Sequence, residues 1–129
     1  MRVFSVFMVA AVAICGSLIP GTTLAHTKVV ASTPAEGATI KPSRVVSLTF
    51  SEPLPPTTVA ASIVMTAMPG MTDHSPMTIR NFKSNWSSDK RVLTLNLRDA
   101  LPVGSYDVKW QAAGADGHRA TGKVSFTVR

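Results

Sequence analysis

The segment Tyr106-Asp-Val-Lys-Trp-Gln-Ala112 decides the fold class, because apolar and polar residues alternate through its whole length. Side chains on an extended strand point to opposite faces in turn, so this alternation predicts a strand with one face on a core and the other toward solvent. The same pattern recurs in three further segments, 45–50, 93–98 and 124–129. Four half-buried strands therefore form the framework of the expected fold.

Working outward, weaker strand patterns lie near 27–32, 59–66 and 77–82, and proline and glycine separate the segments. No amphipathic helix longer than a turn or two is convincing. About seven short strands in roughly 100 residues predict an all-β fold, a seven-stranded Greek-key sandwich or barrel of immunoglobulin-like or cupredoxin-like type. Asp116-Gly117 between the last two strong segments predicts a hairpin with a type I′ turn.

Residues 1–25 have the pattern of a secretory signal peptide. Arg2 is followed by an apolar stretch, Pro20-Gly21 interrupts it, and Thr23-Leu24-Ala25 resembles a cleavage site. A membrane anchor is the alternative, but the apolar stretch is barely long enough to span and no basic stop follows it. Cleavage after Ala25 would leave one domain, 26–129, without a cysteine, since the single Cys15 lies in the leader.

The formal net charge is +6, and the basic residues are scattered along the chain. They form no stripe and no nucleic-acid motif accompanies them, so a nucleic acid is not an expected partner. The absence of thiols in the mature chain suits a protein that handles redox metals in an oxidising compartment.

Four of the six methionines lie in Met65-Thr-Ala-Met68-Pro-Gly-Met71-Thr-Asp-His74-Ser-Pro-Met77. Thioether sulfur is a soft donor, so several methionines and one imidazole converging on a point favour Cu(I). The alternative is that they fill gaps in the core, which is reasonable for Met65 at the end of an apolar segment. It fails for Met71 and Met77, which stand among Pro, Gly, Thr, Asp and Ser in an expected loop.

A second candidate site contains nitrogen and oxygen donors. After cleavage His26 would be the first residue, and its α-amine and Nδ1 could chelate one ion, a donor set that favours Cu(II). Asp116 and His118 would be presented together by the hairpin turn. If the N-terminus lies at that end of the sandwich, the three residues give a tetragonal Cu(II) site. A terminal histidine that arose by accident, and a His118 that is exposed and idle, are the alternatives.

These motifs resemble a known family, the periplasmic copper-resistance proteins CopC and PcoC. The resemblance covers essentially the whole chain after the leader. It rests on His26 and on the segments Ser32-Thr-Pro-Ala-Glu-Gly37, Phe50-Ser-Glu52, Met65-Thr-Ala-Met68-Pro-Gly-Met71, His74-Ser-Pro-Met77, Tyr106-Asp-Val-Lys-Trp110, Asp116-Gly-His118 and Thr121-Gly122. It implies a seven-stranded Greek-key β-barrel or sandwich with a Cu(I) site and a Cu(II) site at opposite ends.

Carried over by position, the resemblance gives each site its donors. The Cu(I) donors would come from Met65, Met68, Met71, His74 and Met77, and the Cu(II) ligands would be His26, Asp116 and His118. Glu52 matches an acidic residue near the Cu(II) site, where a carboxylate could orient an imidazole. One departure is that Thr72-Asp73 separates Met71 from His74, where the family is expected to have a single residue.

The sequence therefore predicts a periplasmic copper carrier, without a catalytic residue, that stores or ferries copper. The resemblance also implies a copper transporter of the CopD type in the inner membrane as recipient, and a multicopper oxidase as a further partner. Two other functions stay open. One is a copper monooxygenase with an N-terminal histidine, although the chain lacks long aromatic loops for gripping a polysaccharide. The other is a metal-free immunoglobulin-like interaction module.

Overall fold

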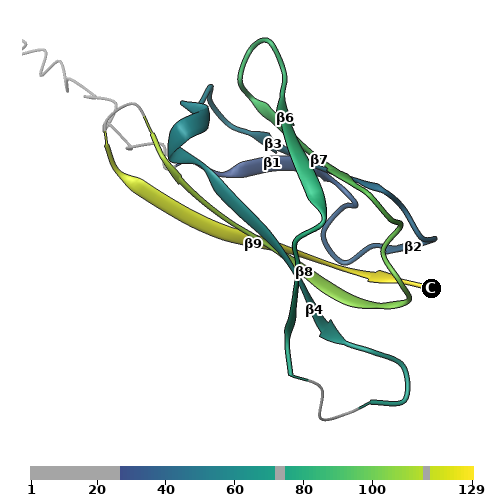
Figure 1. Ribbon diagram of the computed structural model, residues 1–129. Coiled ribbons are helices and arrows are strands. Elements are labelled where there is room, and N and C mark those ends of the chain that lie inside the picture. Colours follow the sequence, from purple (N-terminus) through teal and green to yellow (C-terminus); the bar gives the residue numbers. More distant parts are fainter. Residues whose placement is uncertain (1–26, 72–74, 115–116) are drawn as a thin grey trace, which may run out of the picture.

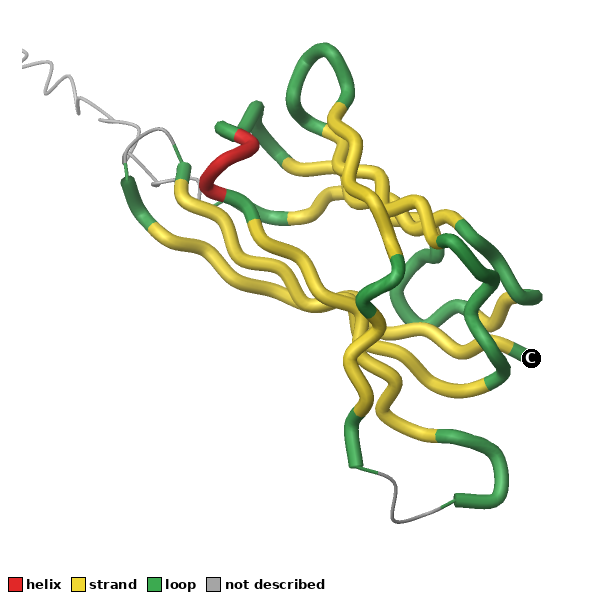
Figure 2. Tube along the Cα trace, viewed as in Figure 1, coloured by secondary structure: helices red, strands yellow, loops and turns green. Residues whose placement is uncertain are grey.

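The protein is a sandwich of two β-sheets, seen in a computed structural model that describes residues 27–71, 75–114 and 117–129 (Figure 1). Figure 2 shows how strands make up most of the described chain, with one short helical turn. The elements in chain order are β1 (Val29–Thr33), β2 (Thr39–Ile40), β3 (Val45–Phe50), the 3-10 helix η1 (Pro56–Thr58), β4 (Ala60–Ala67), β5 (Met77–Ile79), β6 (Phe82–Trp86), β7 (Val92–Leu97), β8 (Gly104–Ala113) and β9 (Arg119–Val128).

One sheet has the strand order β1-β3-β7-β6 and the other has the order β2-β9-β8-β4-β5. All neighbours are antiparallel except the short pair β2 and β9. The expected all-β, two-sheet architecture is confirmed. Across the described residues there are nine strands in place of about seven.

The segment 77–82 is not the single strand that the sequence predicted. Its chain leaves the second sheet after Ile79 and joins the first sheet at Phe82, so it supplies both β5 and β6. The alternation of faces along a strand gives the physical reason. Met77 and Ile79 would share one face of a continuous strand, whereas Phe82 would lie on the opposite face. A strand that kept going would have turned Phe82 toward solvent.

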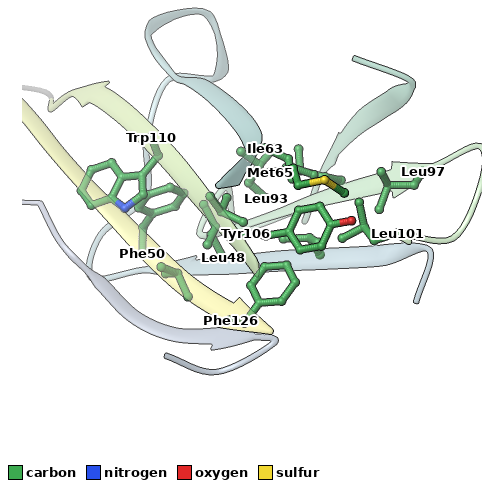
Figure 3. Close-up of a cluster of buried hydrophobic side chains, with 14 of the residues drawn as sticks. Leu48, Phe50, Ile63, Met65, Leu93, Leu97, Leu101, Tyr106, Trp110 and Phe126 are labelled. Carbon is green, nitrogen blue, oxygen red and sulfur yellow. The ribbon is translucent and has the colours of Figure 1, made fainter. Parts of the chain in front are cut away.

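The core lies between the inner faces of the two sheets, as Figure 3 shows. The apolar residues of the segment 106–112 are all buried there, as the alternation predicted. The rings of Trp110 and Phe50 meet edge to face at 5.2 Å, and Tyr106 stacks on Phe126 at 5.5 Å. Because Phe50 belongs to the first sheet and Trp110 to the second, this aromatic contact joins the two layers.

Strands β8 and β9 form the expected hairpin, but its turn is longer than the predicted type I′ turn. The Gly114 N–H donates to the His118 carbonyl at 3.0 Å, so three residues separate the closing pair. Gly117 has a φ of +82° and its N–H donates to the Gly114 carbonyl. A glycine in the left-handed region is typical of a three-residue hairpin loop.

The predicted leader, residues 1–25, lies outside the described residues. In the part of the chain that the structure describes, no helix has the length and apolarity required to cross a membrane.

Candidate metal centre

Met68 and Met71 are held opposite each other by a tight turn at the tip of the β4–β5 hairpin. The Met71 N–H donates to the Met68 carbonyl at 3.1 Å, and the two residues form an isolated antiparallel bridge. Pro69 and Gly70 are the central residues, and Gly70 has a φ of +77°. Proline followed by a glycine at positive φ is the pattern of a type II turn. Residues paired in this way send their side chains to the same face, so two thioethers share one small region.

The exposure of these side chains suits an exchangeable ion. Met71 is 52% exposed, while Met68 is half-buried and packs against the edge of the core. Met77 begins β5 and is 49% exposed. Exposed, flexible thioethers at one end of a sheet can reach a soft ion without rearrangement of the core.

Met65 has a different environment from the other methionines. It is paired with Met77 across the β4–β5 ladder, but it is only 1% exposed and belongs to the core cluster. Its methyl group lies 3.5 Å from the place where a Cβ on Gly104 would be. This placement matches the interpretation of Met65 as a residue that fills the core.

His74 lies outside the described residues. The structure places its flanking segments, which end at Met71 and resume at Ser75, in the same hairpin connection between β4 and β5 (Figure 1, bottom). The described sulfur donors at this end are therefore Met68, Met71 and Met77.

The first described residue of the chain is fixed at the other end of the sandwich. The buried Thr27 donates its hydroxyl hydrogen to the Glu52 carboxylate at 2.6 Å. The backbone is held as well, since the Lys28 N–H donates to Ser51 Oγ and the Ser51 N–H donates to the Lys28 carbonyl. His26 lies outside the described residues, but its neighbour is hydrogen-bonded directly to the predicted acidic residue Glu52.

His118 is exposed and directly precedes β9, and Asp116 lies outside the described residues. The hairpin that carries His118 is tied to η1, because the Thr58 hydroxyl donates to the Ala113 carbonyl at 3.0 Å. The contact between Phe50 and Trp110 places the end of β3, just before Glu52, beside the last part of β8. Glu52 and His118 thus belong to the same end of the sandwich.

The register of β8 separates the two candidate sites. Ala60 pairs with Gln111 near the His118 hairpin, and Ala67 pairs with Ser105 near the methionine turn. The nine residues from Ser105 to Ala113 make eight steps of extended strand, which span roughly 26 Å at 3.3 Å per residue. The methionine site and the histidine site therefore lie at opposite ends of one strand.

Within the described ranges, no three or more His, Cys, Asp or Glu side chains are grouped as a metal site. Of the three predicted Cu(II) ligands, only His118 is described.

The paired thioethers belong to a different donor class. The composition of the methionine window alone did not predict the pairing of Met68 with Met71. The Pro69-Gly70 dipeptide was the signal that could have found it, since this dipeptide marks a tight turn. Thr27 carries no signal in the sequence.

Comparison with known proteins agrees with the architecture and with the family that the sequence resembles. The family model of the CopC domain matches residues 29–129. Copper resistance protein C from Pseudomonas syringae pv. tomato is 40% identical over 114 residues, which cover 88% of this chain and 89% of that protein. Copper resistance protein C from Escherichia coli is 33% identical, covering 88% and 92%.

The solved structures give the same result. The crystal structure of PcoC from Escherichia coli, described as a methionine-rich copper resistance protein, matches with a TM-score of 0.72 and 32% identity, covering 81% of this chain and 100% of that one. CopC from Methylosinus trichosporium OB3b matches with a TM-score of 0.62 and 28% identity, covering 80% and 93%. With a sandwich of this topology, and a domain match that extends from β1 to the last residue, the chain belongs to the CopC family.

Proposed function

We propose that this protein binds copper and acts in copper resistance, as the names of its relatives indicate for them. The observation that carries the proposal is the pairing of Met68 with Met71 across a tight turn, beside an exposed Met77. Three soft donors at one end of a sheet favour Cu(I) over harder ions.

The Cu(I) site would consist of Met68, Met71 and Met77, with His74 as the nitrogen donor from the same loop. Cu(I) requires only three or four donors, so this set is sufficient without Met65. Thr72-Asp73 separates Met71 from His74, one residue more than the family is expected to have, so His74 is the member of this set that most needs testing. Half of the surface of Met71 and of Met77 is open, which supports release of the ion by ligand exchange with a partner.

The Cu(II) site would be formed by His26, through its α-amine and its ring, with His118 and Asp116. Two findings support this proposal. Thr27 is anchored to Glu52, and the end of the sandwich that holds Glu52 also presents the His118 hairpin. By accepting from Thr27, the Glu52 carboxylate would position the neighbouring His26. The same carboxylate could also orient an imidazole.

A carrier with two sites of different hardness would hold both oxidation states of copper. In this proposal the leader directs export and is cleaved after Ala25, and residues 26–129 act in the periplasm. An inner-membrane transporter of CopD type and a multicopper oxidase would be its partners. The role is binding and transfer, with no catalytic step assigned to any residue.

Metal titration of the purified, processed protein tests this function. We expect one Cu(I) under reducing, anaerobic conditions and one Cu(II) under oxidising conditions, each bound without displacing the other. Cu(II) binding should weaken as the pH falls below about 8, because the α-amine and imidazole must be deprotonated to bind. Intact mass should correspond to residues 26–129.

A protein extended by one residue before His26 is the matched control, because the extension converts the amine to an amide and leaves every methionine in place. We expect it to lose tight Cu(II) binding and keep Cu(I). Binding of neither ion would refute the copper function, and oxidation of chitin or cellulose with hydrogen peroxide would favour the monooxygenase alternative.

A further inference from the structure

Among the described residues, strand β9 has an unpaired edge along its first half. It pairs with β8 over its whole length, but the described residues bond its other side only near its end. There the Gly37 N–H donates to the Ser125 carbonyl at 2.7 Å, and the Thr127 N–H donates to the Ala38 carbonyl at 2.9 Å. Nothing in the described ranges makes an equivalent backbone bond with the part of this edge before Ser125.

The register shows which backbone groups are left open. Ser125 and Thr127 direct their N–H and C=O groups away from β8, and the pairing of β8 with β9 continues without a bulge. Because the direction of these groups alternates along a strand, Lys123, Thr121 and Arg119 direct theirs the same way. Three donors and three acceptors therefore face outward, the arrangement to which an added strand can pair.

A groove of about 600 Å³ lies along this edge, between β9 and the edge strand β1 of the other sheet. Its apolar lining includes Val30, which a bulge in β1 leaves 56% exposed, and the ring of Trp110. Gly122 allows the ring to approach, since a Cβ there would lie 2.6 Å from it. Figure 3 shows Trp110 on the inner side of the sandwich, close to β9. The groove thus has an apolar floor beside a row of open backbone groups.

The charged residues that line the groove are two lysines and one glutamate. Lys28 and Lys123 line it, both are exposed, and Lys123 is directly opposite Lys109 in the register of β8 and β9. Like charges directly opposite each other destabilise a sheet unless an anion lies between them. The carboxylate of Glu36 also lines the groove, where it accepts from the Ser125 N–H at 2.9 Å, and Asp107 accepts from the Ser125 hydroxyl on the outer face of β9.

We propose that this groove binds an extended acidic segment of a partner protein, which adds to β9 as a further strand. The open groups from Arg119 to Lys123 would pair with its backbone. Its acidic side chains would lie beside Lys123 on the outer face, and small apolar side chains would alternate with them over Trp110. A second copy of this chain is disfavoured as occupant, because it would bring Lys28 and Lys123 against the same charges. Because Lys28 and Arg119 lie within two residues of the proposed Cu(II) ligands His26 and His118, the docking surface is tested on the copper-free protein.

The test uses an acetylated seven-residue peptide of alternating glutamate and valine, added to the copper-free protein. We expect the backbone amides of Arg119, Thr121 and Lys123 to shift in NMR spectra and to gain protection from hydrogen exchange. Lys123→Glu should weaken binding about five- to tenfold, since an attractive cross-strand charge pair becomes repulsive. Lys83→Glu is the matched control, because Lys83 is an exposed lysine on the edge strand β6 of the other sheet. It should leave binding unchanged.

Two further arms separate strand addition from simple charge attraction. The same peptide with N-methyl groups on its bonding edge keeps its charge but cannot donate to β9, so it should not bind. Equal weakening by Lys83→Glu, or undiminished binding of the methylated peptide, would overturn the proposal. It would also be overturned if the same amides shifted on self-association without peptide, or if anionic phosphatidylglycerol vesicles bound in the same Lys123-dependent way.

Discussion

Met68 and Met71 face each other across the Pro69-Gly70 turn, with the Met71 N–H bonded to the Met68 carbonyl at 3.1 Å. The turn reverses the chain between the two residues, so their side chains share one face before any ion binds. Pre-formed donors lose less conformational freedom on binding than donors that a loop must first collect.

Replacing Met68 and Met71 together with leucine should abolish tight Cu(I) binding while the fold survives. Volume-conserving swaps usually cost less than about 1.5 kcal/mol. Affinity in a competition titration should fall by roughly a hundredfold or more, since loss of even an outer hydrogen-bond partner costs 10–100-fold in metal sites. Met65→Leu makes the same chemical change in the core and should leave Cu(I) affinity unaltered. Equal losses in the two proteins would contradict the assignment.

The turn itself can be tested through Gly70, whose φ is +77° and whose surroundings are open. Gly70→Ala should cost about 1–2 kcal/mol of folding free energy through backbone strain alone and should weaken Cu(I) binding by moving the two methionines apart. Gly37→Ala is the matched control, with a φ of +74° and equally open surroundings. It should destabilise by a similar amount in urea unfolding, with unchanged Cu(I) affinity. If the Gly70 variant kept full affinity, the turn geometry would be irrelevant to the site.

Thr27→Val should loosen the N-terminal segment. The substitution removes the hydroxyl that donates to Glu52 and keeps the shape of the side chain. We expect a loss of roughly 1.5–3 kcal/mol of stability, the range for hydrogen bonds to charged groups, and weaker Cu(II) binding by calorimetry. Ser125→Ala is the control, since it breaks a similar bond from a hydroxyl to the Asp107 carboxylate on the outer face of β9. Ser125→Ala should lower stability without changing Cu(II) affinity. If Thr27→Val left Cu(II) affinity unchanged and Ser125→Ala weakened it, a role for Glu52 near that site would be excluded.

Tyr106 should make stability fall at alkaline pH. Burial raises the pKa of Tyr106 to about 12, and its hydroxyl donates to the Pro102 carbonyl at 2.5 Å. The unfolded tyrosine ionises near pH 10, so the unfolded state releases its proton first. The stabilisation of the fold by protonated Tyr106 is therefore complete below about pH 10 and is lost as the pH rises toward 12.

The measurement is urea unfolding of the protein and of Tyr106→Phe over this pH range. The variant should lose less free energy of unfolding between about pH 10 and pH 12, because it has no tyrosine hydroxyl to ionise. Tyr106 is the single tyrosine of the chain, so its absorbance reports its ionisation directly. A tyrosine absorbance transition near pH 10 in the folded protein would rule out the raised pKa.

The sequence by itself determined the fold class and the character of the donors. Alternation in the segment 106–112 fixed which face of β8 is buried, because the period of a strand admits only two assignments and only one of them buries Trp110 and Tyr106. The softness of sulfur depends on residue type alone, so the methionine window by itself indicated copper. The predictions for His26, His74 and Asp116 fall on residues that the structure does not describe, and they stay predictions.

Tertiary structure decided what depends on contacts between distant segments. It buried Met65 against Gly104, left Met71 and Met77 exposed, and set Met68 opposite Met71 across the turn. It divided 77–82 between two sheets, placed Thr27 on Glu52, and left the first half of β9 with β8 as its one neighbour among the described strands. Local periodicity records which face of a strand is buried, but not which strand lies beside it, since the hydrogen bonds and packing that choose neighbours form only when the chain has folded.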